Sequence, residues 1–84
     1  MDQRPAAVEL SGHAKRRLRL VGLTMTALLG ILAAPDALTA GHSGRTNAWH
    51  HDGRRWIRVT YIDEGATRTV VTVTDREHRG PQGA

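Results

Sequence analysis

Three histidines and an aspartate lie close together in the middle of the chain, and they are the side chains best suited to bind a metal ion. His42, His50, His51 and Asp52 fall within eleven residues. Imidazole is the commonest metal ligand in proteins, but this spacing matches none of the usual zinc patterns. Neighbouring side chains such as His50 and His51 point to opposite sides of an extended chain. We therefore expect no metal and no cofactor, and interpret these residues as part of a flexible polar segment.

A copper ion at a newly formed amino terminus is the one exception to this expectation. If the chain were cut after Ala40, the new terminus would begin with Gly41 and His42. A free amine, an amide nitrogen and an imidazole are nitrogen ligands that suit the tetragonal geometry of copper.

No other group of residues forms a recognisable catalytic arrangement. The chain has no cysteine, which excludes both a thiol nucleophile and disulfide bonds. The motifs G-x-S-x-G and H-E-x-x-H and a glycine-rich phosphate loop are absent as well. Asp63 and Glu64 are adjacent carboxylates in a predicted turn, where nothing would drive their pKa values apart. The sequence therefore predicts a protein that is not an enzyme.

Arginines surround a tryptophan in the second half of the chain. Arg54, Arg55 and Arg58 flank Trp56, and arginine beside an aromatic ring is typical of proteins that bind single-stranded nucleic acid. However, the whole chain has 12 basic and 8 acidic residues and a net charge of +4, without a dense basic block. We therefore expect no nucleic-acid partner. The same residues would suit an anionic lipid or wall polymer of a cell envelope.

The first half of the chain has the layout of a secretory signal peptide. Four cations between residues 15 and 19 precede fifteen uncharged residues, 20–34, and Pro35 and small residues follow. A basic region, an apolar helix and a small residue at the cut define such a signal. We predict cleavage between Ala40 and Gly41 and a secreted, extracytoplasmic protein, after transient membrane insertion of the signal helix. The predicted divisions are an n-region 1–19, an h-region 20–34 and a c-region 35–40.

Two features bear on the export route and on the source of the sequence. The pair Arg16-Arg17 resembles part of a twin-arginine export signal, but Arg19 stands where that signal has a large apolar residue. The general secretion route is therefore favoured. The chain has eleven arginines and one lysine and much alanine, glycine and threonine, which resembles the composition of high-GC actinobacterial proteins.

Two other interpretations of the apolar segment stay open. An uncleaved helix would anchor a small envelope protein in the membrane, facing outside, although a spanning helix needs about 20 apolar residues. A helix in a protein core is disfavoured, because a run this uniformly apolar is not amphipathic and would need burial on all sides.

The segment 56–75 predicts a β-hairpin. It is rich in Val, Ile, Thr, Tyr and Trp, and its apolar and polar residues alternate. A three-residue loop, Asp63-Glu64-Gly65, would place Gly65 where a positive φ is needed. In this register one face is apolar, whereas a two-residue turn at Glu64-Gly65 would bring Arg68 beside Tyr61 on that face. The predicted partner-binding face consists of Ile57, Val59, Tyr61, Val71 and Val73.

The expected fold is therefore mostly disordered with a small β component. An N-terminal signal helix (1–40) would precede a flexible polar leader (41–55), the hairpin (56–75) and a disordered tail (76–84). A lone hairpin is marginally stable in water, so we expect order to depend on a partner or on self-association. The predicted function is that of a small exported protein that binds an unknown protein or envelope component through the hairpin, by strand addition.

Overall fold

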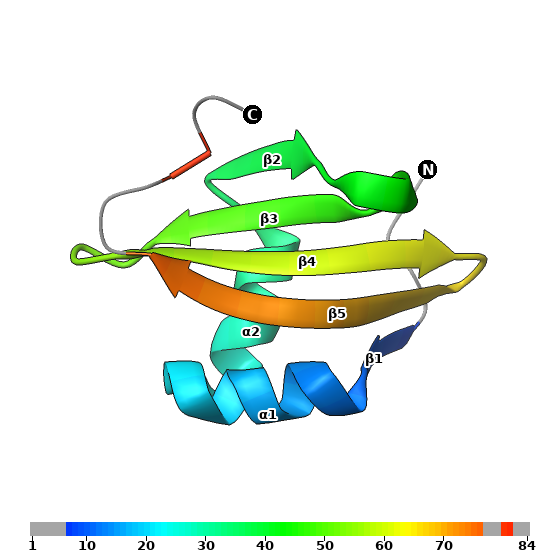
Figure 1. Cartoon of the computed structure of the whole chain (residues 1–84), viewed down its shortest axis with the longest axis horizontal. Coiled ribbons are helices and arrows are strands. Elements are labelled where there is room, and N and C mark those ends of the chain that lie inside the picture. Colours follow the sequence, from blue (N-terminus) through cyan, green and yellow to red (C-terminus); the bar gives the residue numbers. More distant parts are fainter. Residues whose placement is uncertain (1–6, 77–79, 82–84) are drawn as a thin grey trace.

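Five strands form one mixed sheet in the computed structural model, which describes residues 7–76, 80 and 81 (Figure 1). Their order across the sheet is β1-β5-β4-β3-β2. Strand β1 pairs with β5 in parallel, and the other neighbours are antiparallel. The strands are β1 (Ala7–Leu10), β2 (Ala37–Ala40), β3 (Thr46–His51), β4 (Trp56–Glu64) and β5 (Thr67–Arg76).

Two helices connect β1 to β2, and a single turn of 3-10 helix, η1 (His42–Gly44), connects β2 to β3. Helix α1 (Gly12–Val21) begins at Ser11, whose hydroxyl accepts from the Ala14 amide at 3.0 Å. It ends at Gly22, which has a left-handed φ of 79°. Helix α2 (Met25–Ala33) is capped in the same way by Thr24.

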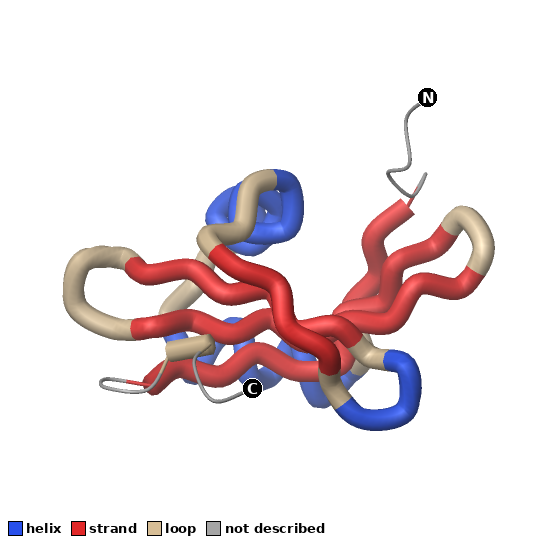
Figure 2. Tube along the Cα trace, turned by 90° about the horizontal axis from the view of Figure 1, so that it is seen from above, coloured by secondary structure: helices blue, strands red, loops and turns tan. Residues whose placement is uncertain are grey.

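The core lies between the sheet and the two helices. Helix α1 runs beside β5, and α2 stands against one face of the central strands (Figures 1 and 2). The fully buried side chains include Leu28 of α2 and the β4 residues Ile57 and Val59. Polar residues such as Arg58 and Thr60 alternate with them and point to the other face, which neither α1 nor α2 covers. We call this second face the open face.

The expectation of a mostly disordered chain with one hairpin is wrong. The segment interpreted as a polar leader, 41–55, contains η1 and β3, and the hairpin strands β4 and β5 lie at the centre of the sheet. The chain is ordered because strands outside the hairpin pair with both of its edges. Strand β1 pairs with β5, and β3 pairs with β4. Of the tail predicted to be disordered, 77–79 and 82–84 lie outside the described residues.

The apolar run 20–34 is not one helix. It contains the end of α1, the connection 22–24 and all of α2. Burial on all sides is not needed, because Leu28 and Ile31 face the core while Leu29 is 42 % exposed. The expectation that this segment would not form a core helix is wrong, because two short helices can each bury one side only.

The predicted three-residue loop and its register are also wrong. The hairpin turns at Gly65 and Ala66, so that Glu64 lies opposite Thr67 and Asp63 opposite Arg68. Gly65 has a positive φ of 61°, as the first central residue of a type II′ turn requires.

Arg68 shows why the argument from segregated faces failed. It lies on the apolar face. A charged residue on that face was the reason for rejecting a two-residue turn. Its guanidinium carbon is 4.1 Å from the centre of the Tyr61 ring, and its nitrogens donate to both Asp63 oxygens at 2.7 and 2.9 Å. A planar cation that is paired and stacked on an aromatic ring is tolerated on an apolar face.

A β-bulge in β5 changes the register again. Tyr61 lies opposite Val70 and Thr60 opposite Thr72, so Val71 is an extra residue without a partner on β4. Beyond the bulge, Val59 lies opposite Val73. The inward-facing valines of β5 are therefore Val70 and Val73, both fully buried, whereas Val71 is half-buried.

Arg55 ties the β3–β4 turn to the rest of the molecule. Its guanidinium donates to Asp75 at the end of β5 at 2.7 Å, to Asp52 in the turn at 3.3 Å and to the carbonyl of Val21 at 3.0 Å. The side chain is 20 % exposed. A single arginine thus connects the end of α1 to the β3–β4 turn and to the end of β5, which lie at the same end of the sheet.

The bulge predicts unequal effects at two neighbouring valines. Val70→Thr places a hydroxyl in the core and should lower the free energy of unfolding by about 1–3 kcal/mol. Val71→Thr should lower it by less than about 1 kcal/mol, because that side chain is partly in water. Urea unfolding followed by tryptophan fluorescence measures both. An equal or larger effect at Val71 would contradict the register.

The Asp52 turn predicts a loss of stability in acid. Amide groups of Arg54 and Arg55 donate to this carboxylate at 3.0 Å each and lower its pKa from 3.8 to about 2. Because the pKa is lower in the folded chain, the carboxylate stabilises the fold above about pH 4 and this contribution disappears as the pH falls toward 2. Asp52→Asn should therefore be less stable than wild type at pH 6 but not at pH 2. Acid unfolding followed by circular dichroism tests this, with Glu64→Gln, which removes a carboxylate at the end of β4, as the charge-matched control.

Candidate functional site

The predicted partner-binding face lies beneath the chain's own helices. Ile57, Val59, Tyr61 and Val73 are at most 6 % exposed, and Val71 occupies the bulge. In the folded full chain these side chains therefore form the core rather than a surface. Partner binding through this face stays a prediction only for a chain that lacks residues 1–40.

The structure does not bring the three central histidines together. His42 lies in η1, whereas His50 is on the helix-covered face with its Nδ1 3.3 Å from Asp36 Oδ2. His51 points the other way and packs edge-on against Trp56, with ring centres 5.0 Å apart. Among the described residues, no group of three potential ligands is placed to hold a metal ion.

The arginines near Trp56 also separate. Arg54 is exposed in the turn, Arg55 forms the clamp to α1, and Arg58 lies on the open face. There its guanidinium carbon is 5.8 Å from the centre of the Trp49 ring. Trp56 meets Trp49 edge-on at 6.3 Å. The two tryptophans thus pack edge-on against each other, and the ring of Trp49 lies under Arg58.

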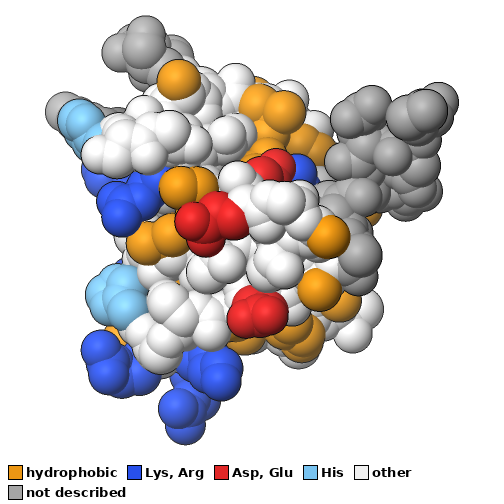
Figure 3. All heavy atoms as spheres, turned by 90° about the vertical axis from the view of Figure 1, so that its right-hand side faces the viewer, with side chains coloured by type: hydrophobic (Ala, Val, Ile, Leu, Met, Phe, Trp, Pro, Cys, Tyr) orange, Lys and Arg blue, Asp and Glu red, His pale blue; other side chains and the backbone are white. Residues whose placement is uncertain are grey.

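A basic pocket of about 190 Å³ lies on the open face where η1 meets β3, β4 and β5. We call it the sheet pocket. Its lining residues are Gly41, His42, Arg45, Asn47, Arg58, Thr60 and Thr72. Figure 3 views this end of the molecule and shows basic side chains on its left flank and lower edge, whereas acidic ones lie nearer the middle.

Hydrogen bonds fix the polar floor of the sheet pocket. The Thr60 hydroxyl donates to Asn47 Oδ1 at 2.7 Å, and Asn47 Nδ2 donates to the Thr39 hydroxyl at 3.4 Å. The same hydroxyl accepts from the Trp49 ring nitrogen at 2.8 Å. On the β5 side, Thr72 Oγ1 is 3.1 Å from His13 Nε2. The floor is therefore positioned before any ligand arrives.

Arg58 has no carboxylate partner among the described residues. Its Nε is buried and has no hydrogen-bond partner, and neither has the hydroxyl of Thr74 directly across the ladder. Burial, and then repulsion from Arg76, lower the pKa of Arg58. Within residues 7–76, 80 and 81, no carboxylate forms an ion pair with Arg58 or Arg45. A buried donor that lacks a partner costs free energy unless a ligand or water supplies one.

Sequence reasoning identified Arg58 but not the pocket around it. The other lining residues come from η1, β3 and β5, and they meet only because β3 pairs with β4. The alternation of Arg58 and Thr60 with Val59 and Tyr61 was the available signal that these polar residues share a face.

The predicted cleavage site lies within the folded chain. Ala40 ends β2 opposite Thr46, and the amide of Gly41 donates to the Arg45 carbonyl at 2.8 Å. No helix in the described part of the chain has the length and apolar character needed to cross a membrane. Removal of residues 1–40 would delete β1, β2 and both helices and uncover the apolar face of β4.

Cleavage and export stay predictions, and one measurement tests both. Protein recovered from the culture medium should begin within about three residues of Gly41 if the signal is cut. The uncovered face should then make the shortened chain self-associate. Intact mass of protein from medium and from membranes is the measurement. Full-length chain in the medium would contradict cleavage, and full-length chain confined to membranes would favour the anchored alternative.

Known proteins offer no further guide to the sheet pocket. Comparison of the chain with protein-family models, with curated proteins and with solved structures finds no match.

Proposed function

We propose that the protein is a small non-enzymatic binding module that recognises an anionic group in the sheet pocket. The observation that carries this proposal is Arg58, whose buried Nε has no partner beside a pocket lined by a second arginine and a histidine. An anion beside the guanidinium would offset its charge and accept hydrogen bonds from the N–H groups that reach the pocket.

The donors of the pocket favour an oxyanion. A guanidinium presents several N–H groups in a fixed plane, which suits phosphate, sulfate and carboxylate oxygens. Arg45 and His42 stand at the rim, and the hydroxyl of Thr72 lies on the floor. A volume of about 190 Å³ admits a single small group rather than a large ligand. For an exported protein, a phosphate-bearing envelope component is the corresponding partner class.

Titration of the full chain with inorganic phosphate, followed by tryptophan fluorescence, tests the proposal, because Trp49 lies beneath Arg58. Wild type should bind and should unfold at a higher temperature in phosphate. Arg58→Gln should weaken binding about tenfold or more, since a hydrogen bond to a charged group contributes about 1.5–3 kcal/mol. Without phosphate this variant should be about as stable as wild type, because it removes a partly buried positive charge that burial disfavours.

Arg54→Gln is the matched control, because Arg54 is an exposed arginine outside the pocket. It should bind phosphate like wild type. If both substitutions weakened phosphate binding equally, net charge alone would explain the effect. That result would contradict a specific site at Arg58. A single-stranded oligonucleotide that binds more tightly than phosphate and is insensitive to Arg58→Gln would also contradict the proposal.

A further inference from the structure

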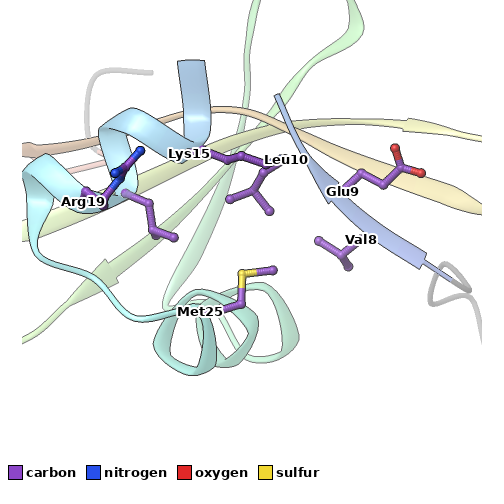
Figure 4. Close-up of a pocket in the computed structure, with 7 residues that line it drawn as sticks. Val8, Glu9, Leu10, Lys15, Arg19 and Met25 are labelled. Carbon is purple, nitrogen blue, oxygen red and sulfur yellow. The ribbon is translucent and has the colours of Figure 1, made fainter. Parts of the chain in front are cut away.

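A second hollow lies on the helix-covered side, between β1, α1 and the start of α2. It has a volume of about 610 Å³, within the range of small-molecule sites. We call it the helix groove. Its lining residues are Val8, Glu9, Leu10, Lys15, Leu18, Arg19 and Met25 (Figure 4).

The floor of the helix groove is apolar. Val8, Leu10 and Leu18 are half-buried and pack against the core. Met25 is 43 % exposed, and Figure 4 shows its side chain rising from α2 into the space between α1 and β1. Large apolar side chains that stay open to water beside a hollow favour occupation by an apolar ligand.

One wall of the groove is basic. Lys15 and Arg19 are one helical turn apart on α1 and therefore lie on the same side of it. No acidic residue occurs between Glu9 and Asp36 in the sequence, and no carboxylate among the described residues pairs with either cation. Glu9 is the one acidic residue in the lining, and its carboxylate points away from Val8, Leu10 and Met25 in Figure 4.

We propose that the helix groove binds an anionic amphiphile with a single acyl chain, such as a free fatty acid. The acyl chain lies on Val8, Leu10 and Leu18, and Met25 closes over it. The carboxylate lies against Lys15 and Arg19. Charge complementarity selects an anion, and the apolar floor selects a hydrocarbon chain for the rest of the ligand. This site is separate from the sheet pocket and does not depend on the function proposed for it.

The methyl group of Met25 provides a direct probe. With ¹³C-methyl-labelled methionine, its NMR signal is assigned by its absence in Met25→Leu. Decanoate, titrated as monomers into the full chain, should shift this signal, and decan-1-ol should bind more weakly. Lys15→Gln and Arg19→Gln should each weaken decanoate binding about fivefold, but not decan-1-ol binding. Arg16→Gln removes a cation from the same helix outside the groove and is the control.

Three outcomes would overturn the proposal. Decanoate that leaves the Met25 signal unchanged excludes the groove as the site. Equal weakening by Arg16→Gln and Arg19→Gln would mean that only the net charge of α1 matters. Binding to vesicles of anionic phospholipid without binding to monomeric decanoate would identify a bilayer surface as the partner instead. Circular dichroism of each variant shows whether the fold is retained, and Lys15, Arg16 and Arg19 have no described structural contact that their removal would break.

Discussion

In a regular strand, residues three apart face opposite sides of the sheet, yet Val70 and Val73 are both fully buried beneath the helices. The bulge at Val71 resolves this conflict, because one extra residue turns the second half of β5 over. It also turns the Val71 carbonyl to the edge of the sheet, where the Ser11 hydroxyl donates to it at 3.0 Å. Arg17 donates to the Val73 carbonyl in the same way. Beyond Leu10, where β1 ends, α1 thus takes the place of β1 beside β5. The position of α1 therefore depends on the one extra residue, Val71.

Local signals in the sequence located the strands of the hairpin but not their partners. Alternation placed two strands within 56–75, where β4 and most of β5 lie. The bulge could not be predicted from alternation, because it is the point at which alternation stops. The helices had signals that were overlooked: Ser11 and Gly22 bracket α1, and Thr24 precedes α2. The order of a basic, an apolar and a small-residue region in the same segment is what predicts a signal peptide, and that interpretation stays a prediction.

The sheet pocket was harder to predict than the strands that form it. Its donors are separated by up to thirty-one residues, from Gly41 to Thr72, and only the paired strands bring them together. The cluster of Arg54, Arg55 and Arg58 looked like one patch in the sequence. In the structure Arg54 is exposed to solvent in the turn, Arg55 reaches the end of α1, and Arg58 lies on the open face. Spacing along the chain is therefore a poor guide to shared function when a turn and a strand meet.

The parallel pairing of β1 with β5 joins residues that are far apart in the sequence. Val8 lies opposite Arg68, so β1 has no partner strand until β5 has been synthesised. Until then, Val70 and Val73 are missing from the core against which Val8 and Leu10 pack. Closure of the helical layer over the sheet therefore depends on the synthesis of β5.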